Sequence, residues 1–543
     1  MWPINNPLIY RGVRSSFGRS GFWGWMLGLG LFMGFIFVCI YIDASEDVSR
    51  HLTHGNQVSL SQLTGYRYAW FCFGLELFVA IFVTLWIMGD SVVQERKQNT
   101  HEFLETLPLH PLRKALGLLL GRCTWALIVV ALAGAVGTIS ALIGEVEMER
   151  ILWLHAIALS GFIASGFLGL LASLGLGRMS LGGLAAIVFL LLSMGISSAL
   201  LGEKTVILPL LPLAPLACLG WSMIPVHELP PLIQQNAFHF YSLPVPWQAG
   251  PVAFYLFLAV VFFLSAGRGL ARPDAARSPR WQGLIGLALF HGLLVGFLAD
   301  NVRRAAEVCL HSPNYSSLES AEAVVAICLA YLAGFGAVIL LWMILQTPTM
   351  DKAAAWMRHR PRGPRGNTIV RGLFDDGSPS WFAGLLIWGI TLAVTLAINQ
   401  YFFQARISAR VLLAVAGVWA LFLLGYASLF QAGVLTSRLA GFLVGILFIA
   451  ACLLGPSLLA MVTESISPLY ATPVGMLEHI EDLVEPSSAQ AAKEAWIAVM
   501  KNAFSGLIIL VIGQGLCALR LATLGYGEPS ARENRQADGA AAS

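Results

Sequence analysis

The chain has few charged side chains. Only 12% of its 543 residues are Asp, Glu, Lys or Arg, whereas 57% are hydrophobic; soluble proteins carry about 25% charged residues. Many uninterrupted apolar stretches reach about 20 residues, the length that crosses the hydrocarbon core of a bilayer as a helix. Because an open sheet leaves backbone groups unpaired in lipid, the spans are expected to be helices. We therefore expect an all-α integral membrane protein.

Three chemical signatures are missing from the sequence. It contains no GxxxxGK[ST] phosphate-binding loop, and "GEKT" at Gly202–Thr205 lacks the spacing of that motif. Its eight cysteines form no CxxC pair and lie mostly inside apolar runs, which argues against a zinc site or a disulfide framework. No paired catalytic His, Asp or Ser motif stands at the end of a span. We expect no enzymatic activity, cofactor or metal in this chain.

What the sequence does have is a series of twelve apolar segments with the length of membrane spans. These segments are Phe22–Ile42, Tyr68–Gly89, Thr124–Ile143, Ile151–Leu174, Leu181–Leu201, Val252–Ala266, Gly283–Leu298, Ala323–Leu345, Trp381–Ala397, Val411–Phe430, Leu439–Met461 and Phe504–Leu521. The first is long for the apolar region of a signal peptide and lacks a small-x-small cleavage site, so we expect an uncleaved span.

Charge is distributed unevenly between alternate loops. One set of loops, together with both termini, collects most of the Arg and Lys residues, whereas the other set carries mainly acids, such as Asp43, Asp47, Glu145 and Glu147. The positive-inside rule then places both termini in the cytoplasm and requires an even number of spans. We expect a multi-pass protein of the plasma membrane, which in a bacterium is the inner membrane.

The two halves of the chain share an order of spans and loops. In both 1–280 and 281–521, a long polar inner segment follows the second span, and a proline-broken apolar outer segment precedes the sixth. This order predicts a six-span unit used twice in parallel orientation, although any series of helical hairpins produces similar patterns. The outer segments, Leu208–Gly250 and Pro468–Asn502, are predicted to form re-entrant or interfacial helices. Residues 522–543 are predicted to be a disordered cytoplasmic tail.

The polar segment after the second span, residues 94–117, reads "QERKQNTHEFLETLPLHPLRKALG". Asn99 and Glu102 have the spacing of a capping box, which predicts a short helix over Thr100–Leu107 that ends at Pro108. The apolar residues on one face of this helix are Phe103, Leu104 and Leu107. Such a helix can lie in the groove of a partner protein, or it can rest on lipid headgroups. The residues leave both interpretations open.

This segment resembles the signature region of type-2 ABC exporter permeases. The family pattern is acidic-basic-acidic, Gly-Thr, a hydrophobic residue, Glu, two leucines and Pro, followed by Gly-Lys before the third span. The matching residues are Glu95, Arg96, Thr100, Glu102, Leu104, Leu107, Pro108 and Gly117. Asn99 stands where the family has Gly, and Leu118 where it has Lys.

The opening "NPLIYRGVRSSFGRSG" is similar to the amphipathic N-terminal helix of the same family. Asn6, Pro7, Arg11 and Arg14 stand in the expected places. The resemblance covers about residues 1–270, and residues 281–543 match only in topology.

The resemblance implies that this chain is the membrane-spanning permease of an ABC export complex. ATP and Mg would bind to a separate ATPase subunit. The residues assigned to coupling with that subunit are Glu95, Arg96, Thr100, Glu102, Phe103, Leu104, Leu107 and Pro108. Membrane lipids are further expected partners, and nucleic acid is not. Whether a homodimer or a pseudo-dimer within one chain forms the pathway stays open.

Glu76 is a candidate intramembrane polar site, because it falls near the middle of the second span. An ionised carboxylate is expensive in a membrane and is functional by default; the alternative is a glutamate that is protonated or hydrogen-bonded between helices. His155 and His291 also lie in spans, where a histidine hydrogen-bonded across helices is expected. An ion-coupled secondary transporter is thus the alternative function, and a non-transporting scaffold is a third.

Overall fold

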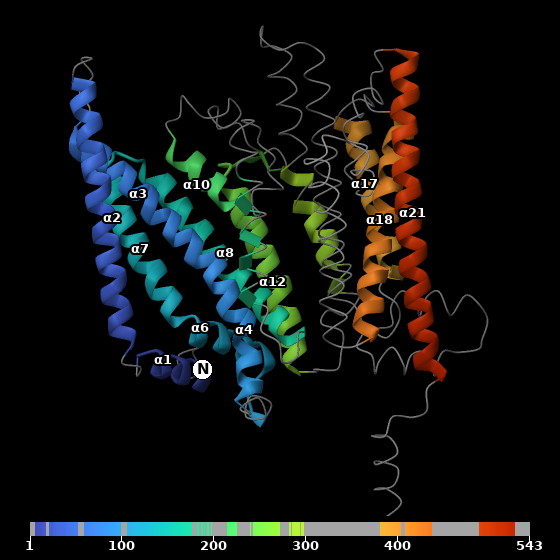
Figure 1. Ribbon diagram of the computed structural model, residues 1–543, viewed down its shortest axis with the longest axis horizontal. Helices are drawn as coiled ribbons and strands as arrows, with labels where there is room; N and C mark the ends of the chain where they lie inside the picture. The colour runs from blue at the N-terminus through green and yellow to red at the C-terminus, as the bar shows by residue number, and fades with distance from the viewer. Residues whose placement is uncertain are drawn as a thin grey trace, which may run out of the picture. The chain divides into compact units, whose positions relative to one another are not determined.

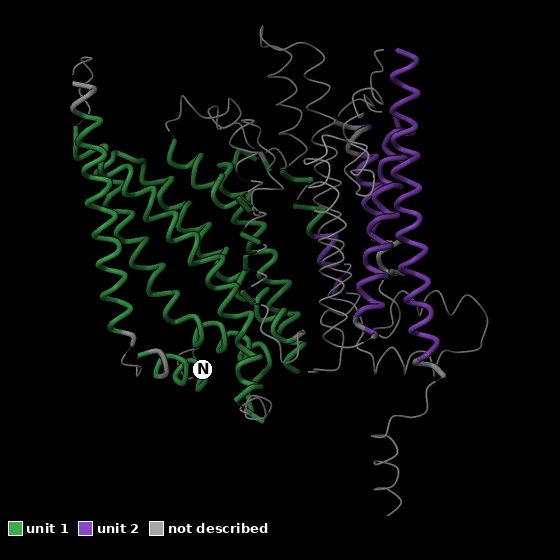
Figure 2. The backbone as a smooth tube through the Cα atoms, in the orientation of Figure 1, with its two compact units in different colours: residues 1–273, 290–305 green, residues 274–289, 306–543 purple. Residues whose placement is uncertain are grey.

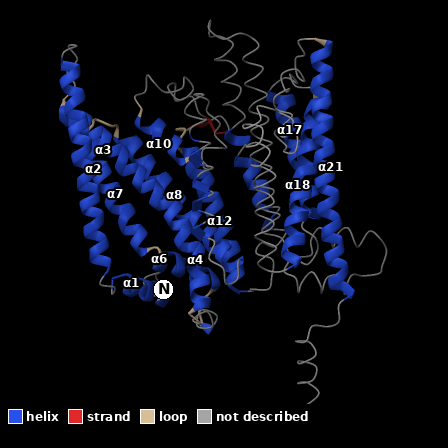
Figure 3. Ribbon diagram, in the orientation of Figure 1, coloured by secondary structure: helices blue, strands red, loops and turns tan. Residues whose placement is uncertain are grey.

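The computed structural model describes ten continuous ranges, together with interrupted stretches between 182 and 197 and between 282 and 297. The continuous ranges are 6–17, 21–52, 59–98, 106–175, 214–224, 239–240, 243–271, 381–402, 408–436 and 488–526. In these residues every element is helical except a short antiparallel pair, β1 (His239–Phe240) and β2 (Leu243–Pro244) (Figure 3). Seven helices of this described part are long and apolar enough to cross a membrane.

The predicted all-α, multi-pass membrane class is therefore confirmed. The count of twelve spans, the orientation and the repeat stay predictions. The predicted spans Ala323–Leu345 and Leu439–Met461, most of Leu181–Leu201 and residues 527–543 of the predicted tail lie outside the described residues. The prediction of a disordered tail from residue 522 is wrong for residues 522–526, which continue the last described helix to Tyr526.

Two compact units divide the chain (Figure 2). The first is Met1–Pro273 with Phe290–Ala305, and the second is Asp274–Leu289 with Ala306–Ser543. The described helices of the second unit are α17 (Trp381–Phe402), α18 (Ala409–Thr436) and α21 (Ala489–Tyr526).

Helices α18 and α21 pack through glycines, because a Cβ atom on Gly513 would lie 2.6 Å from the carbonyl oxygen of Gly425. A hydrogen bond of 2.7 Å from Gln514 Nε2 to Ser428 Oγ also joins these two helices. Trp388 Nε1 of α17 donates to the Ala416 carbonyl of α18 at 2.9 Å.

The first unit contains the polar segment, and its helices are shown in Figure 1. They are α1 (Pro7–Phe17), α2 (Gly21–Leu52), α3 (Leu60–Phe78), η2 (Val79–Val83), α4 (Thr84–Lys97), α6 (Pro111–Arg122), α7 (Thr124–Ile143), α8 (Met148–Gly175), α10 (Pro215–Met223) and α12 (Ala249–Ala271). Helix α7 has the predicted bounds. Helices α2, α8 and α12 are longer than predicted, because their end turns extend beyond the apolar runs on which the prediction rests.

Helices α3, η2 and α4 form one continuous segment, Leu60–Lys97. A capping box between Ser59 and Gln62 starts it. Its π-helical turn, η2, is held by two side chains: Thr84 Oγ1 donates to the Val79 carbonyl, and Ser165 Oγ of α8 donates to the Ala80 carbonyl, both at 3.1 Å. Turns of this kind are rare and frequently mark functional sites.

Helix α10 belongs to a segment for which the sequence predicts re-entrant or interfacial helices. It is nine residues long and largely buried. At its carboxyl end, Tyr66 Oη of α3 donates to the Met223 carbonyl at 2.8 Å, and Arg150 Nη1 of α8 donates to the Ile224 carbonyl at 3.0 Å. Helix α10 is therefore fixed to one end of α3 and α8, and α1 and α6 lie at the other end of the unit (Figure 1).

Glycine allows α1 and α6 to cross with their backbones in contact. A Cβ atom on Gly12 would lie 2.3 Å from the Gly121 carbonyl oxygen, and one on Gly121 would lie 2.6 Å from the Leu8 carbonyl oxygen. Asn6 strengthens the crossing, because its Oδ1 accepts from the Leu8 amide at 3.0 Å and its Nδ2 donates to the Arg113 carbonyl at 2.8 Å. The amphipathic helix is thus attached to the polar segment.

Replacing Gly12 with alanine tests this crossing. We expect Gly12→Ala to force α1 away from α6, at a cost of about 1–3 kcal/mol for an overpacked contact. Trypsin should then cleave after Arg11 and Arg14 faster than in the wild-type protein in detergent. Gly24→Ala is the matched control, because no atom lies within 4 Å of its Cβ position. Equal cleavage rates in the two variants would show that the crossing does not hold α1.

Candidate functional site

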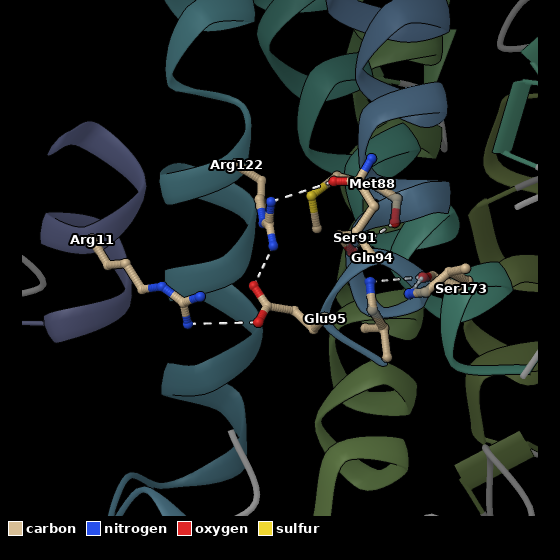
Figure 4. Close-up of polar contacts among 9 residues, drawn as sticks. Arg11, Met88, Ser91, Gln94, Glu95, Arg122 and Ser173 are labelled. Atoms are coloured by element: carbon tan, nitrogen blue, oxygen red, sulfur yellow. Dashed lines mark hydrogen bonds and ion pairs between the residues drawn. The ribbon is translucent and has the colours of Figure 1, made fainter. Parts of the chain in front are cut away.

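A polar cluster at the end of α4 surrounds Glu95, whose side chain is only 4% exposed. Arg122, the last residue of α6, places Nη2 against Glu95 Oε1. Arg11 of α1 places Nη1 3.5 Å from Glu95 Oε2. Figure 4 shows both guanidinium groups pointing toward this one carboxylate. The cluster therefore joins three elements that are far apart in the sequence.

The two arginines are not equivalent partners of Glu95. Arg122 is the closer of the two and is 28% exposed, whereas Arg11 is 43% exposed. Arg122 Nη1 also lies 3.5 Å from Gln94 Oε1. A buried carboxylate loses its hydration and depends on close, hydrogen-bonded cations. Arg122 is therefore expected to supply most of the stabilisation of Glu95.

The thiol of Cys123, which follows Arg122 directly, does not replace Glu95 as an anionic partner of the Arg122 guanidinium. Burial raises the pKa of the Cys123 thiol, and the opposing effect of the Arg122 charge is smaller. The thiol therefore stays neutral at physiological pH. Glu95 is the anion with which Arg122 pairs in this cluster.

A second set of contacts fixes the end of α4 to α8. Ser173 Oγ of α8 accepts from the amides of Val92 and Val93 at 2.9 and 3.2 Å, as Figure 4 shows. The two helices approach closely here, because a Cβ atom on Gly169 would lie 2.6 Å from the Leu85 carbonyl oxygen. The helix end from which the polar segment starts is thus attached to α1, α6 and α8.

The structure describes only some of the residues assigned to ATPase coupling. Arg96 and Leu107 are half-buried, and Pro108 is exposed. The remaining ones lie outside the described residues, together with most of the predicted helix: Thr100, Glu102, Phe103 and Leu104.

Glu95 is buried in contacts within its own chain, and these contacts hold the end of α4 against α1 and α6. Sequence reasoning matched Arg11 to the family pattern but did not pair it with Glu95, and it did not single out Arg122. The spacing of 27 residues between Glu95 and Arg122 gives no sign of their contact.

A second polar cluster lies between α3, α7 and α8. His155 Nδ1 is 2.9 Å from Glu76 Oε1, and His155 Nε2 is 2.8 Å from Thr138 Oγ1. The Thr138 hydroxyl donates to the Gly134 carbonyl at 2.8 Å. Gly134 makes room for the cluster, because a Cβ atom there would lie 3.0 Å from His155 Cε1 and 3.2 Å from Glu76 Cδ. The structure therefore brings together two residues that the sequence left separate.

The described residues contain no group of three or more His, Cys, Asp or Glu side chains that could hold a metal ion. Comparison of the chain with protein-family models, curated proteins and solved structures finds no match. The function is accordingly inferred from the two clusters and from the polar segment.

Substitution of Glu95 tests the first cluster. We expect Glu95→Gln to lower the free energy of unfolding by about 1–3 kcal/mol, because Arg122 loses its charged hydrogen-bond partner. Arg11→Gln is the comparison, and it should cost less than about 1 kcal/mol, because that pair is longer and more exposed. Thermal unfolding of both variants in the same detergent gives the two values. If Arg11→Gln were the more destabilising, the assignment of Arg122 as the main partner would be wrong.

Proposed function

We propose that this chain is the membrane-spanning permease of an ABC export complex, and that it moves substrate across the plasma membrane with ATP hydrolysed by a separate subunit. The observation that carries the proposal is the position of the polar segment. It starts at the end of α4, where Glu95 joins α1, α4 and α6. A coupling element needs such attachments, because it has to pass movement of the ATPase on to the spans.

The attachments connect the segment to two spans. Toward the amino terminus, α4 continues through η2 into α3 as one helical segment. Toward the carboxyl terminus, α6 ends at Arg122 and α7 begins at Thr124. The Glu95–Arg122 pair links these two paths. A force applied between residues 98 and 106 would therefore move the ends of both spans together, and α1 with them.

The distribution of charge supports the same proposal. The end of the unit that carries α1 and α6 holds Arg11, Arg14, Arg96, Lys97 and Arg113. The opposite end, next to α10, holds the acidic residues Asp43, Asp47, Glu145, Glu147 and Glu149, with two arginines, Arg67 and Arg150, paired to three of them. By the positive-inside rule the α1 end is cytoplasmic. The polar segment would then face the compartment that contains ATP.

Docking would use the apolar face of the segment. Leu107, which is half-buried, and Leu104 would enter a groove of the ATPase, and Arg96 would set the register through its charge. Mg and ATP would bind in the partner.

An ion-coupled secondary transporter is the second candidate function. The observation that favours it is the contact between Glu76 and His155, because ionisable pairs inside spans are typical of ion pathways. The two candidates differ in their source of energy, so one experiment can separate them.

The experiment is to purify the tagged full-length chain from its native host in mild detergent and to measure ATP hydrolysis. We expect an ATPase subunit in stoichiometric amount. The double variant Leu104→Asp, Leu107→Asp should release it, because two charges cannot enter an apolar groove. Leu243→Asp is the matched control, because Leu243 is 64% exposed and lies in β2, outside the polar segment. The control should retain the ATPase.

Two results would contradict the permease proposal. One is a wild-type preparation without an ATPase whose vesicles take up substrate with a proton or sodium gradient alone. That result would favour the second candidate. The other is release of the ATPase by Leu243→Asp as readily as by the double variant, which would show that general destabilisation causes the loss.

A further inference from the structure

The orientation of the Thr138 hydroxyl is linked to the protonation of His155 Nε2 in the second cluster. A hydroxyl has one proton to donate, whereas its oxygen can accept a hydrogen bond at the same time. Thr138 Oγ1 donates to the Gly134 carbonyl, which can only accept. Its contact of 2.8 Å with His155 Nε2 is then a hydrogen bond in which Nε2 carries the proton. In this arrangement Nε2 is protonated.

With Nε2 protonated, the contact between His155 and Glu76 needs one more proton. Nδ1 and Oε1 lie 2.9 Å apart, and two bare acceptors would repel each other at that distance. The proton either sits on Nδ1, which makes an imidazolium facing a carboxylate, or on Oε1, which makes a neutral acid facing a neutral ring. Both forms hold the same number of protons, and both are neutral overall.

The same three side chains also accommodate one proton fewer. If Nε2 loses its proton, the Thr138 hydroxyl can rotate and donate to Nε2, while Nδ1 donates to the Glu76 carboxylate. The Gly134 carbonyl keeps its backbone hydrogen bond within α7, so no buried group is left unpaired. The cluster then carries one negative charge. Protonation therefore changes its charge without breaking the contacts between α3, α7 and α8.

We propose that Glu76, His155 and Thr138 form a proton-binding site inside the membrane-spanning helices. A proton from water adds to the lone pair of His155 Nε2, and the Thr138 hydroxyl turns from donor to acceptor. His155 is the more exposed of the two ionisable groups, because its side chain is 31% exposed and that of Glu76 is 5% exposed. It lies seven residues after Met148, where α8 starts, which corresponds to about 10 Å along the helix.

Among the titratable groups on the neighbouring helices, His155 is the one that pairs with the Glu76 carboxylate. Helices α7 and η2 contain no titratable residue. The titratable groups on the other described elements packed nearby are Tyr66, Arg67, Tyr68 and Cys72 on α3, Cys218 on α10, Tyr255 on α12, and Glu149 and Arg150 on α8. Both basic residues among these pair with other carboxylates: Arg67 pairs with Asp43 and Asp47, and Arg150 donates to Glu147 Oε2 at 2.9 Å.

The site is placed where a change in charge can affect the span. The π turn η2 begins three residues after Glu76 in the same continuous helical segment. Binding of a proton removes a negative charge next to this irregular turn. The inference does not depend on the energy source of transport, because either a permease or an ion-coupled transporter could contain such a site.

The test is nitrogen NMR of the full-length protein, labelled with ¹⁵N-histidine and embedded in lipid bilayers, across about pH 5 to 8. His155→Gln identifies the signals of His155 by subtraction. We expect Nε2 to be protonated at the acidic end and unprotonated at the basic end, while Nδ1 keeps its hydrogen bond to Glu76. Constant protonation of Nε2 over the whole range overturns the proposal, and this wild-type result needs no variant beyond the one used for assignment.

Variants separate proton binding from a merely structural contact. Glu76→Gln should move the transition to lower pH by about one unit or more, because the imidazolium loses its counter-charge. Thr138→Val should also shift the transition, because it removes the hydrogen-bond partner of Nε2 in both protonation states, and Thr138→Ser should restore the wild-type curve. Ser140→Ala is the control, because that hydroxyl lies on the same helix and donates to the Val136 carbonyl. A shift in Ser140→Ala as large as that in Thr138→Val would contradict the role of Thr138.

Discussion

Burial of carboxylates in a chain that is poor in charge is the constraint on which both clusters depend. Glu76 and Glu95 lie in one continuous helical segment, and both are almost fully buried. A carboxylate removed from water needs a cation or a proton at hydrogen-bond distance. Each of the two therefore recruits partners from helices that are distant in the sequence. The packing of α1, α6, α7 and α8 around this segment satisfies that need.

The partners differ in kind, and this gives the middle of the segment, at Glu76, and its end, at Glu95, different properties. A guanidinium group stays charged at every physiological pH, so the attachment of Glu95 to Arg122 does not depend on pH through the arginine. An imidazole, in contrast, can bind and release a proton. The end of the segment at Glu95 is thus held by a permanent charge, whereas the region before η2 is held by a group that can exchange a proton.

The helices could be predicted better than the contacts between them. Apolar runs of span length identified α2, α7, α8, α12, α17 and α18, because lipid selects for length and composition within a single helix. The pairing of Glu76 with His155, 79 residues apart, depends on how α3 and α8 are rotated about their axes, which hydropathy does not encode. The π turn η2 has no sequence signature either, because its carbonyls are satisfied by Thr84 and Ser165 of the folded protein.

The contact between α1 and α6 constrains the membrane topology of the residues between them. Because Gly12 touches Gly121, the two helices lie on the same side of the membrane, and the residues between them must cross it an even number of times. Helix α2 and the segment Leu60–Lys97 are long and apolar enough to supply two crossings. During synthesis α1 leaves the ribosome about a hundred residues before α6, the helix that it covers. If the first helix inserts in the reverse orientation, Gly12 and Gly121 cannot come into contact. The contact between α1 and α6 therefore distinguishes correctly inserted molecules from inverted ones.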